Sequence, residues 1–303
     1  MYQCQACRSA FLDPRPTART IHLAYQTYYT HNSQPRKKTE ELGNVRRAMR
    51  ALANGYRNRR FGANLKPASR LGEIIIPAIP AFRESLDREL RYLPPLKTGA
   101  QLLDVGFGNG VFLRQARQIG WNVAGVDPDL TVVENARKEG LDVRQGDDDA
   151  FADHAGRFDA ITFSHVIEHV HDPVKTLQEA FRLLKPGGFL YLDTPDIDAV
   201  SHKEFGEHWR GLEVPRHLTI FSWPSLQKLL MKTGFKEISR QCRTDVYAGL
   251  AAASRSMRDG KDPRRDKKVT IRDRLKGVLV AMKVRMDFRQ GEFITLVAYK
   301  PKQ

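Results

Sequence analysis

The chain has 303 residues and a mass of 34.5 kDa, with 41% apolar and 28% charged residues. This composition is typical of a soluble protein with a buried core and excludes a disordered chain. Its longest apolar runs are about half a dozen residues, whereas a membrane-spanning helix needs roughly 20. No signal peptide is visible, and three cysteines cannot form a disulfide framework. The sequence therefore predicts a cytoplasmic protein without a membrane-spanning helix.

Charge is distributed unevenly along the chain. Lys and Arg number 50 and Asp and Glu 35, which gives a net charge of +15. Residues 1–100 hold 18 basic and 7 acidic side chains, residues 101–250 hold 17 and 22, and residues 251–303 hold 15 and 6. An acidic middle is thus flanked by two basic ends. Such charge bears on partners rather than on fold. An anionic acceptor, a membrane surface, RNA and an ordinary Arg-rich surface all remain open.

The first third of the chain is predicted to be helical. Residues 36–61 are rich in Arg and Ala, and residues 74–92 form a second helical stretch that Pro77 and Pro80 interrupt near its start. Pro94 and Pro95 end this stretch. We therefore predict an N-terminal part over residues 1–95, made of a cysteine-pair remnant and a helical cap, and a second domain over residues 96–303.

The middle of the chain alternates between strand and helix patterns. Short apolar runs at residues 101–105, 122–126, 141–144, 158–163 and 188–192 predict strands, and residues 111–119, 130–138 and 174–184 predict helices between them. Near-continuous apolar strands joined by helices indicate a doubly wound α/β sheet that is covered on both faces. Two further strands are predicted at residues 237–241 and 293–299, separated by a basic insertion at about residues 250–290.

The strongest motif is the run from Leu102 to Gly110, LLDVGFGNG, in which a strand leads into a glycine loop that opens a helix. Glycines permit unusual torsions and a close approach of the ligand, and a helix N-terminus offers free N–H groups. A dinucleotide-binding fingerprint would need glycine where Val111 stands. The spacing therefore argues against a nicotinamide enzyme.

Acidic residues follow the next two predicted strands. Asp127, in the run Gly125 to Asp129, ends the second strand, where a carboxylate can accept both hydroxyls of an adenosine ribose. The run Gly146-Asp147-Asp148-Asp149 follows the third strand, where a carboxylate can accept from an adenine amino group. Ligands of open α/β sheets bind at these strand ends. Each acid alone is more often a solvated loop residue. Asp104, Asp127 and the acids at residues 147–149, each at the end of a predicted strand, together favour a nucleoside ligand.

These motifs together resemble class I S-adenosylmethionine-dependent methyltransferases. The resemblance implies a Rossmann-like seven-stranded sheet, mostly parallel with an antiparallel last strand, a helical N-terminal extension and a helical insertion before the last strand. It implies S-adenosyl-L-methionine as cofactor. Phe107 stands where the family usually has cysteine. The cofactor-binding residues that it implies are Asp104, Gly106, Phe107, Gly108, Gly110, Asp127, Pro128, Asp147, Asp148, Ser164 and His165.

Later motifs resemble a bacterial branch related to the ubiquinone-biosynthesis O-methyltransferases. They are the fourth-strand segment SHVIEHVHDP, which begins at Ser164, the turn LKPGGFL from Leu184, and PRHLTIFS from Pro215. Some members of that branch bind a divalent cation with carboxylates of the fourth-strand segment. Here His165 replaces one carboxylate, which weakens a hard-cation site. We therefore expect no metal.

Methyl transfer to a hydroxyl needs an aligned donor and acceptor and a base that takes the proton. The candidate catalytic residues are His165, Glu168 and His169 after the fourth strand, and His217 in a later segment. Packing and helix capping remain the alternative for Glu168 and His169, and a hydrogen-bonded structural role remains the alternative for His217. Arg216 is expected either to pair with an anionic acceptor or to form an internal salt bridge.

The two ends carry further signals. Cys4 and Cys7 resemble half of a zinc-binding knuckle, but tetrahedral zinc needs four ligands, and Cys242, His22 and His31 are weak substitutes, so we expect none. Tyr28 and Tyr29 are expected either to reach the ligands or to pack in the core. The insertion carries a helical apolar stripe, from Ile271 to Met286, among Arg and Lys residues. This stripe predicts either a lid that packs on the domain or a helix on a membrane surface.

The sequence thus predicts an enzyme that transfers a methyl group from S-adenosylmethionine by in-line displacement, at an oxygen of a small-molecule or lipid- or sugar-linked acceptor. The segment Ser164-His165-Val166-Ile167 lacks the Asn- or Asp-Pro-Pro-aromatic pattern of base amino-methyltransferases. Two alternatives remain, an RNA-directed methyltransferase and a non-catalytic cofactor-binding protein. No RNA-binding motif supports the first. The sequence does not predict an oligomeric state.

Overall fold

The computed structural model describes residues 1–25, 43–146, 148–151 and 153–302. The chain divides into two compact units, each assembled from separate stretches. The first unit comprises Met1–Thr27, Phe163–Phe181 and Leu192–Tyr299, and the second comprises Tyr28–Thr162, Arg182–Tyr191 and Lys300–Gln303. The proposed boundary near residue 95 stays a prediction. Tyr28, Tyr29, His31, and the predicted helical residues 36–42 lie outside the described residues.

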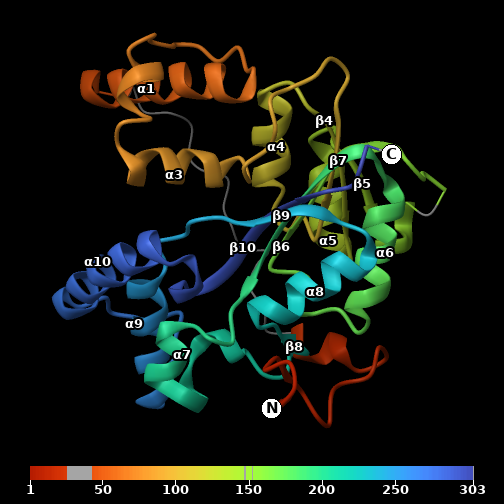
Figure 1. The fold of residues 1–303 in the computed structure, drawn as a ribbon, viewed down its shortest axis with the longest axis vertical. Helices are drawn as coiled ribbons and strands as arrows, with labels where there is room; N and C mark the ends of the chain where they lie inside the picture. The colour runs from red at the N-terminus through yellow and green to blue at the C-terminus, as the bar shows by residue number, and fades with distance from the viewer. Residues whose placement is uncertain (26–42, 147, 152, 303) are drawn as a thin grey trace. The chain divides into compact units, whose positions relative to one another are not determined.

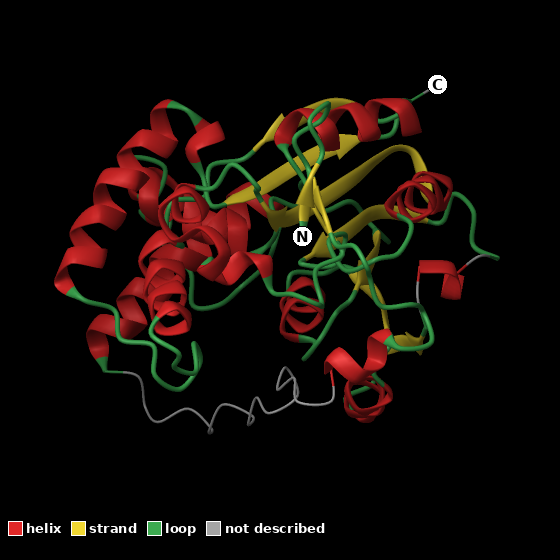
Figure 2. Ribbon diagram, turned by 90° about the horizontal axis from the view of Figure 1, so that it is seen from below, coloured by secondary structure: helices red, strands yellow, loops and turns green. Residues whose placement is uncertain are grey.

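A seven-stranded sheet has the strand order β5-β4-β3-β6-β7-β10-β9 (Figure 1). Pairing is parallel between β3 and β4 and between β4 and β5, and antiparallel between β10 and β9. Figure 2 shows the strands in yellow and the helices in red. The predicted mostly parallel sheet with antiparallel pairing near its C-terminal end is confirmed. Its strands are β3 (Gln101–Val105), β4 (Asn122–Asp127), β5 (Asp142–Gln145), β6 (Phe158–Ser164), β7 (Leu184–Pro195), β9 (Lys236–Arg240) and β10 (Phe293–Tyr299).

One strand differs from its prediction. The strand predicted at residues 188–192 extends in both directions as β7, from Leu184 to Pro195. Gly187 lies within it at a φ of 74°, and its N–H donates to the carbonyl oxygen of Lys300 at 3.0 Å. The expected turn at Lys185 to Gly187 is therefore incorporated into the strand, because backbone pairing with the C-terminal residues continues through it.

The helices between the strands follow their sequence patterns. They are α4 (Val111–Gln118), α5 (Leu130–Lys138) and α6 (Pro173–Leu183). The Asp129 side chain caps α5 by accepting the Thr131 N–H at 2.6 Å. Ser222 caps α8 (Trp223–Thr233), and Gly234, at a φ of 109°, ends it. Local capping thus sets the start of α5, which the sequence predicted, and both ends of α8, which it did not.

The N-terminal helical part of the second unit consists of α1 (Asn44–Phe61), α2 (Gly72–Ile75) and α3 (Pro80–Glu89). The stretch predicted at residues 74–92 is therefore two helices, and α3 begins at Pro80 because proline fits the first turn. Tyr56 packs here among buried apolar side chains, and its hydroxyl donates to Asp87 Oδ1 at 2.7 Å.

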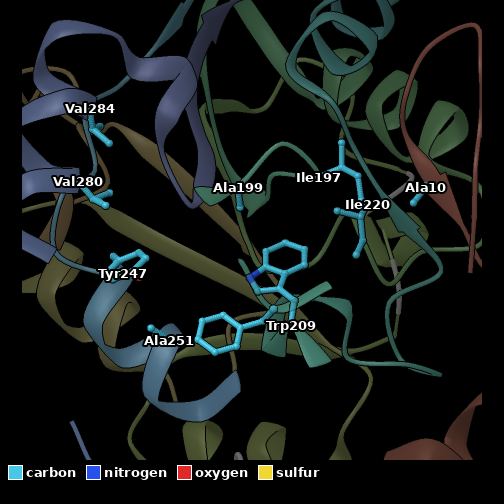
Figure 3. Packing of buried hydrophobic residues seen from close by; sticks show 10 residues of the cluster. Ala10, Ile197, Ala199, Trp209, Ile220, Tyr247, Ala251, Val280 and Val284 are labelled. Atoms are coloured by element: carbon cyan, nitrogen blue, oxygen red, sulfur yellow. The ribbon is translucent and has the colours of Figure 1, made fainter. Parts of the chain in front are cut away.

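Besides α8 and most of α6, the first unit contains a helical group of α7 (Val200–Phe205), α9 (Tyr247–Arg258) and α10 (Ile271–Met286). Its core includes Trp209, Tyr247, Val280 and Val284, all buried (Figure 3). The Trp209 indole N–H donates to the Ser201 hydroxyl at 2.7 Å. The helical prediction for residues 271–286 is confirmed, and α9 is an additional helix in the predicted insertion.

A second, small antiparallel sheet in the first unit joins β1 (Tyr2–Gln3), β2 (Ala10–Phe11) and β8 (Thr219–Ile220). Cys4 and Cys7 lie in the turn between β1 and β2. Backbone N–H groups of Cys7 and Ala6 lower the pKa of the Cys4 thiol. Sequence reasoning missed this sheet because its strands have two residues each. Among the described residues, no helix has the length and apolar character needed to cross a membrane.

Candidate active site

The glycine loop, residues 106–110, follows β3 and leads into α4. Gly106, Gly108 and Gly110 have φ values of 67°, 53° and 70°, a region that side chains disfavour. The Gly106 N–H donates to the Val126 carbonyl oxygen at 2.8 Å, which ties the loop to β4. Gly110 is the N-cap of α4 and has no side chain, and Asn109 Oδ1 accepts the first-turn N–H of Val111 at 3.2 Å. The N–H groups of Gly106, Gly108 and Gly110 are all bonded within the protein, so the loop offers a ligand a close approach to backbone that carries no side chain at these positions.

Asp127, at the end of β4, organises this loop. Its Oδ2 accepts the Gly108 N–H at 2.9 Å, and its Oδ1 accepts the Asp129 N–H at 3.0 Å. Burial raises the pKa of Asp127, and these two hydrogen bonds oppose the rise. Each carboxylate oxygen has a second lone pair. Asp127 therefore retains the capacity to accept hydroxyl donors, as a ribose ligand requires.

Asp104, at the end of β3, is fully buried and only partly satisfied. Its Oδ1 accepts from the Arg91 guanidinium and from the Thr162 hydroxyl, the latter at 2.8 Å. Its Oδ2 has no hydrogen-bond partner within the described residues. Burial raises the pKa of Asp104, and the Arg91 charge opposes the rise. A buried acceptor without a donor is costly, so this oxygen fits a ligand group that carries N–H donors, such as the amino group of S-adenosylmethionine.

The structure describes the remaining predicted cofactor-binding residues to different extents. The Phe107 ring is buried against Gly125, where an added Cβ would lie 2.8 Å from it, so any ligand contact of Phe107 is through its backbone. Pro128 follows Asp127, and half-buried Ser164 ends β6. Asp147 lies outside the described residues, and of Asp148 only its place in the 3-10 helix η2 (Asp148–Phe151) is described.

The first unit brings together the four predicted catalytic residues, His165, Glu168, His169 and His217, which we term the imidazole cluster. His165 lies just after β6 at a φ of 57°. Its Nδ1 is 3.3 Å from Glu168 Oε1, and its Nε2 is 3.3 Å from Asp193 Oδ2. Burial lowers the pKa of His165, but these two carboxylates raise it to about 9. His165 is therefore an imidazolium at neutral pH, with both N–H groups donated.

The two carboxylates beside His165 are buried and ionised. Asp193 also accepts from the Arg243 guanidinium and from the Thr295 hydroxyl. Burial opposes ionisation, but Arg243 and His165 hold the pKa of Asp193 below its usual range. Glu168 Oε2 accepts the Thr194 hydroxyl at 3.0 Å, and the His165 hydrogen bond lowers the pKa of Glu168 against the effect of burial. Alternating positive and negative groups thus fix the His165 ring.

His169 differs from His165 in its hydrogen bonds. Its Nδ1 is 3.1 Å from the Arg216 carbonyl oxygen and 3.0 Å from the Tyr25 hydroxyl. Because a carbonyl oxygen only accepts, Nδ1 carries the proton in this arrangement. Nε2 keeps its lone pair, and no described residue bonds to it. The side chain is only partly buried, so this lone pair can take a proton.

His217 packs edge-on against His169, with ring centroids 4.6 Å apart. Its Nδ1 donates to the Gly211 carbonyl oxygen at 2.7 Å. Burial lowers the pKa of His217 to about 4, so the ring is neutral at pH 7. Arg216 pairs with Glu213 at 2.8 Å. Of the two alternatives for Arg216, the structure therefore has the internal salt bridge. The Arg210 hydrogen bond, acting against burial, lowers the pKa of Glu213 to about 2.

Ligand atoms of Glu168, His169 and His217 all lie within 4.8 Å of one another. Hard cations such as Mg²⁺ prefer oxygen ligands, and this set has one carboxylate and two imidazoles. Both Glu168 oxygens are already engaged, by His165 and Thr194. The residues therefore do not fit a site for a hard cation such as Mg²⁺, and the expectation of no metal stays a prediction.

A family model described as a methyltransferase domain matches residues 81–240, more than half of the chain. The chain belongs to this methyltransferase family. The predicted class I S-adenosylmethionine-dependent family, and with it the cofactor, is confirmed. Curated relatives include the ubiquinone biosynthesis O-methyltransferase of Xanthomonas oryzae pv. oryzae (strain PXO99A), 40% identical over 103 residues, which are 32% of this chain and 43% of the relative. The Cronobacter sakazakii enzyme of the same name is 34% identical over 110 residues, 34% of this chain and 45% of the relative.

The methyltransferase therefore spans less than half the length of these curated relatives. Among solved structures, a Haloferax volcanii methyltransferase in complex with the Trm112 activator aligns with a TM-score of 0.50 at 23% identity, over 72% of this chain and 89% of that one. Phosphoethanolamine N-methyltransferase 2 of Haemonchus contortus, solved with S-adenosyl-L-methionine, aligns with a TM-score of 0.50 at 20% identity, over 82% and 60%. These likenesses support the fold.

Sequence reasoning missed several residues that bond to the predicted site residues. Arg91 and Thr162 reach Asp104, and Asp193 and Arg243 reach the His165 network. No motif marks them, because their partners are distant in sequence. Asp193 had one detectable signal, a carboxylate within the apolar strand β7, since a charge in a buried strand needs a partner.

Proposed function

We propose that this methyltransferase transfers the methyl group of S-adenosylmethionine to a hydroxyl oxygen of a small-molecule or lipid-linked acceptor. The observation that carries the proposal is the His169 ring, whose Nδ1 bonds the Arg216 carbonyl oxygen, which leaves Nε2 to accept a proton. This ring packs edge-on with His217, and one of its nitrogens lies within 4.8 Å of ligand atoms of Glu168 and His217. Oxygen acceptors need a base in this way, because a hydroxyl loses its proton as it is methylated. The 40% identity to O-methyltransferases over 103 residues supports the same choice.

Cofactor binding is assigned to the glycine loop and to the two carboxylates beside it. Asp127 accepts ribose hydroxyls with its remaining lone pairs, and Asp104 Oδ2 accepts from the cofactor's amino group. When bound, S-adenosylmethionine supplies a methyl group on a positively charged sulfur. Arg91 balances the buried Asp104 charge and stacks on the Phe112 ring, 3.8 Å from its centroid, which fixes the carboxylate before any ligand binds.

Within the imidazole cluster, we assign to His169, and not to His165, the role of the base that accepts the proton of the acceptor hydroxyl. His165 already carries two protons that are donated to carboxylates, so it offers no lone pair. The pKa of His217, about 4, makes it a weak base. His169 Nε2 therefore takes the proton as the acceptor oxygen forms its bond to the methyl carbon and the carbon–sulfur bond breaks. The Arg216 carbonyl oxygen and the His217 ring position the His169 ring, and the positive His165 attracts an anionic acceptor.

The test uses methyl-labelled S-adenosylmethionine with the purified methyltransferase and fractionated bacterial extract. The proposal expects label in the small-molecule or lipid fraction, absent with Asp127→Ala and strongly reduced with His169→Gln. Label in RNA would replace the proposed acceptor by RNA. No label in any fraction while the cofactor still binds would indicate a non-catalytic binding protein and contradict the proposal.

A further inference from the structure

Helix α10 (Ile271–Met286) has two apolar faces, and only one of them is packed. Val280 and Val284 are buried in the core cluster with Tyr247 and Ala251 of α9 (Figure 3). On the other side, six large apolar side chains are between 48% and 88% exposed. They are Ile271, Leu275, Val278, Leu279, Met282 and Met286.

These six residues, which we call the outer stripe, form one continuous band. At 3.6 residues per turn they fall within about 100° of the helix circumference, opposite Val280 and Val284. The band runs the length of the 16-residue helix, about 24 Å at 1.5 Å per residue. Soluble proteins rarely expose a contiguous apolar surface of this kind without a partner.

A basic row lies along each edge of the outer stripe. By the same helical geometry, Arg272 and Lys283 follow one edge, and Arg274 and Arg285 follow the other. All four residues are exposed. The only acidic residue of α10 is Asp273, which is buried, bonds Arg255 at 2.6 Å, and completes a capping box with Thr270. The exposed face of α10 is therefore apolar along its middle and positive on both sides.

We propose that the outer stripe of α10 binds the surface of an anionic phospholipid bilayer. A helix lying in a bilayer interface buries its apolar side chains below the headgroups, while Lys and Arg at both edges reach up to the phosphates. The helix enters only as far as the interface, because its other face stays packed on the protein. This inference does not depend on the proposed acceptor or on the His169 assignment.

Charge favours a bilayer over a second copy of this chain as the partner of the outer stripe. Two outer stripes packed face to face would bring basic rows against basic rows, and α10 has no exposed acidic residue to pair with them. Like charges directly opposed are unfavourable. Beyond the helix, residues 251–303 carry 15 basic and 6 acidic side chains, which adds to the attraction toward an anionic surface.

The test is co-flotation of the full chain with phosphatidylglycerol–phosphatidylcholine vesicles and with vesicles of phosphatidylcholine alone. We expect binding to the anionic vesicles only. A double variant, Leu275→Asp with Leu279→Asp, should lower the partition coefficient by more than tenfold. A second double variant, Arg274→Gln with Lys283→Gln, should lower it by about 25-fold, since each basic residue near an anionic surface contributes about 1 kcal/mol.

A matched control places the same charge on an exposed apolar residue elsewhere. Ile74 is 72% exposed, compared with 77% for Ile271, and Ile74→Asp should bind the vesicles as wild type does. Circular dichroism of all variants monitors folding. Failure of the folded wild type to float would overturn the proposal. So would binding that Leu275→Asp with Leu279→Asp leaves intact, or a sedimentation dimer that this variant abolishes, which would assign the outer stripe to a second copy.

Discussion

The glycine loop after β3 and the imidazole cluster after β6 are held by different interactions. Backbone groups hold the loop: three glycines at positive φ, and two N–H groups donated to Asp127. Charged side chains hold the cluster: His165 lies between Glu168 and Asp193, and Arg243 lies beyond Asp193. Backbone contacts such as those of the loop stay the same when side chains change, whereas a charge network can be changed residue by residue to fit a particular acceptor.

Replacing the proposed base should have the largest effect. His169→Gln removes the Nε2 lone pair, and we expect the rate of label transfer to fall by about 10²- to 10⁴-fold, the usual contribution of general base catalysis. The measurement is the initial rate with saturating cofactor. His171→Gln is the control, because among the described residues the His171 ring hydrogen-bonds only to the Pro16 carbonyl oxygen, at 3.0 Å. An unchanged rate in His169→Gln would remove His169 from the mechanism.

The second-largest effect is expected from replacing Asp127, which holds the glycine loop through the Gly108 N–H. Asp127→Ala leaves the Gly108 and Asp129 N–H groups without their acceptor and removes the proposed ribose contact, together about 3 kcal/mol or roughly 100-fold in cofactor affinity. Isothermal titration calorimetry measures this. Asp129→Ala, which loses the α5 cap, should cost about 1 kcal/mol of stability and leave affinity unchanged. Equal affinity losses in both variants would contradict a specific role for Asp127.

The charge network predicts a smaller effect that depends on pH. The pKa of folded His165 is about 9, above its ordinary 6.5, so its stabilisation is complete below pH 6.5 and is lost as pH rises through 9. Since 39% of the side chain is exposed, solvent screening leaves about 1 kcal/mol.

Asp193→Asn removes one carboxylate partner of His165 and should lower this pKa. NMR titration of the His165 ring measures the change directly. Asp159→Asn, which removes a carboxylate that pairs with Lys185 at 2.7 Å, is the control and should not move it. A His165 pKa near 6.5 in the wild-type protein would show that the network does not hold the ring in its charged form.

The smallest effect concerns the loop backbone. An alanine Cβ at Gly108 would meet no atom within 4 Å, so Gly108→Ala should cost only the strain of a φ of 53°, about 1 kcal/mol. Gly249→Ala also meets no atom within 4 Å, but its backbone is helical, so it should be neutral or slightly stabilising. Urea unfolding of both variants distinguishes strain from packing. Equal costs at the two sites would refute the strain argument.

The contrast between local backbone contacts and long-range charge pairs explains which features could be predicted from the sequence. The glycine spacing, the Asp127 position and helix α5 are local patterns, so they were predictable. The interruption of the helical stretch at residues 74–92 was also predictable, since α2 ends at Ile75 and α3 begins at Pro80. The His165 network was not predictable, since Asp193, Arg243 and Thr295 reach it from later parts of the chain. The roles of the site residues stay predictions.

The central claim is that the glycine loop binds the cofactor and the imidazole cluster serves the acceptor. The most direct test measures S-adenosylmethionine affinity of His169→Gln and Asp127→Ala side by side by calorimetry. We expect wild-type affinity for His169→Gln and about a 100-fold loss for Asp127→Ala. A comparable loss of affinity in His169→Gln would show that the two regions share one task and would contradict the account.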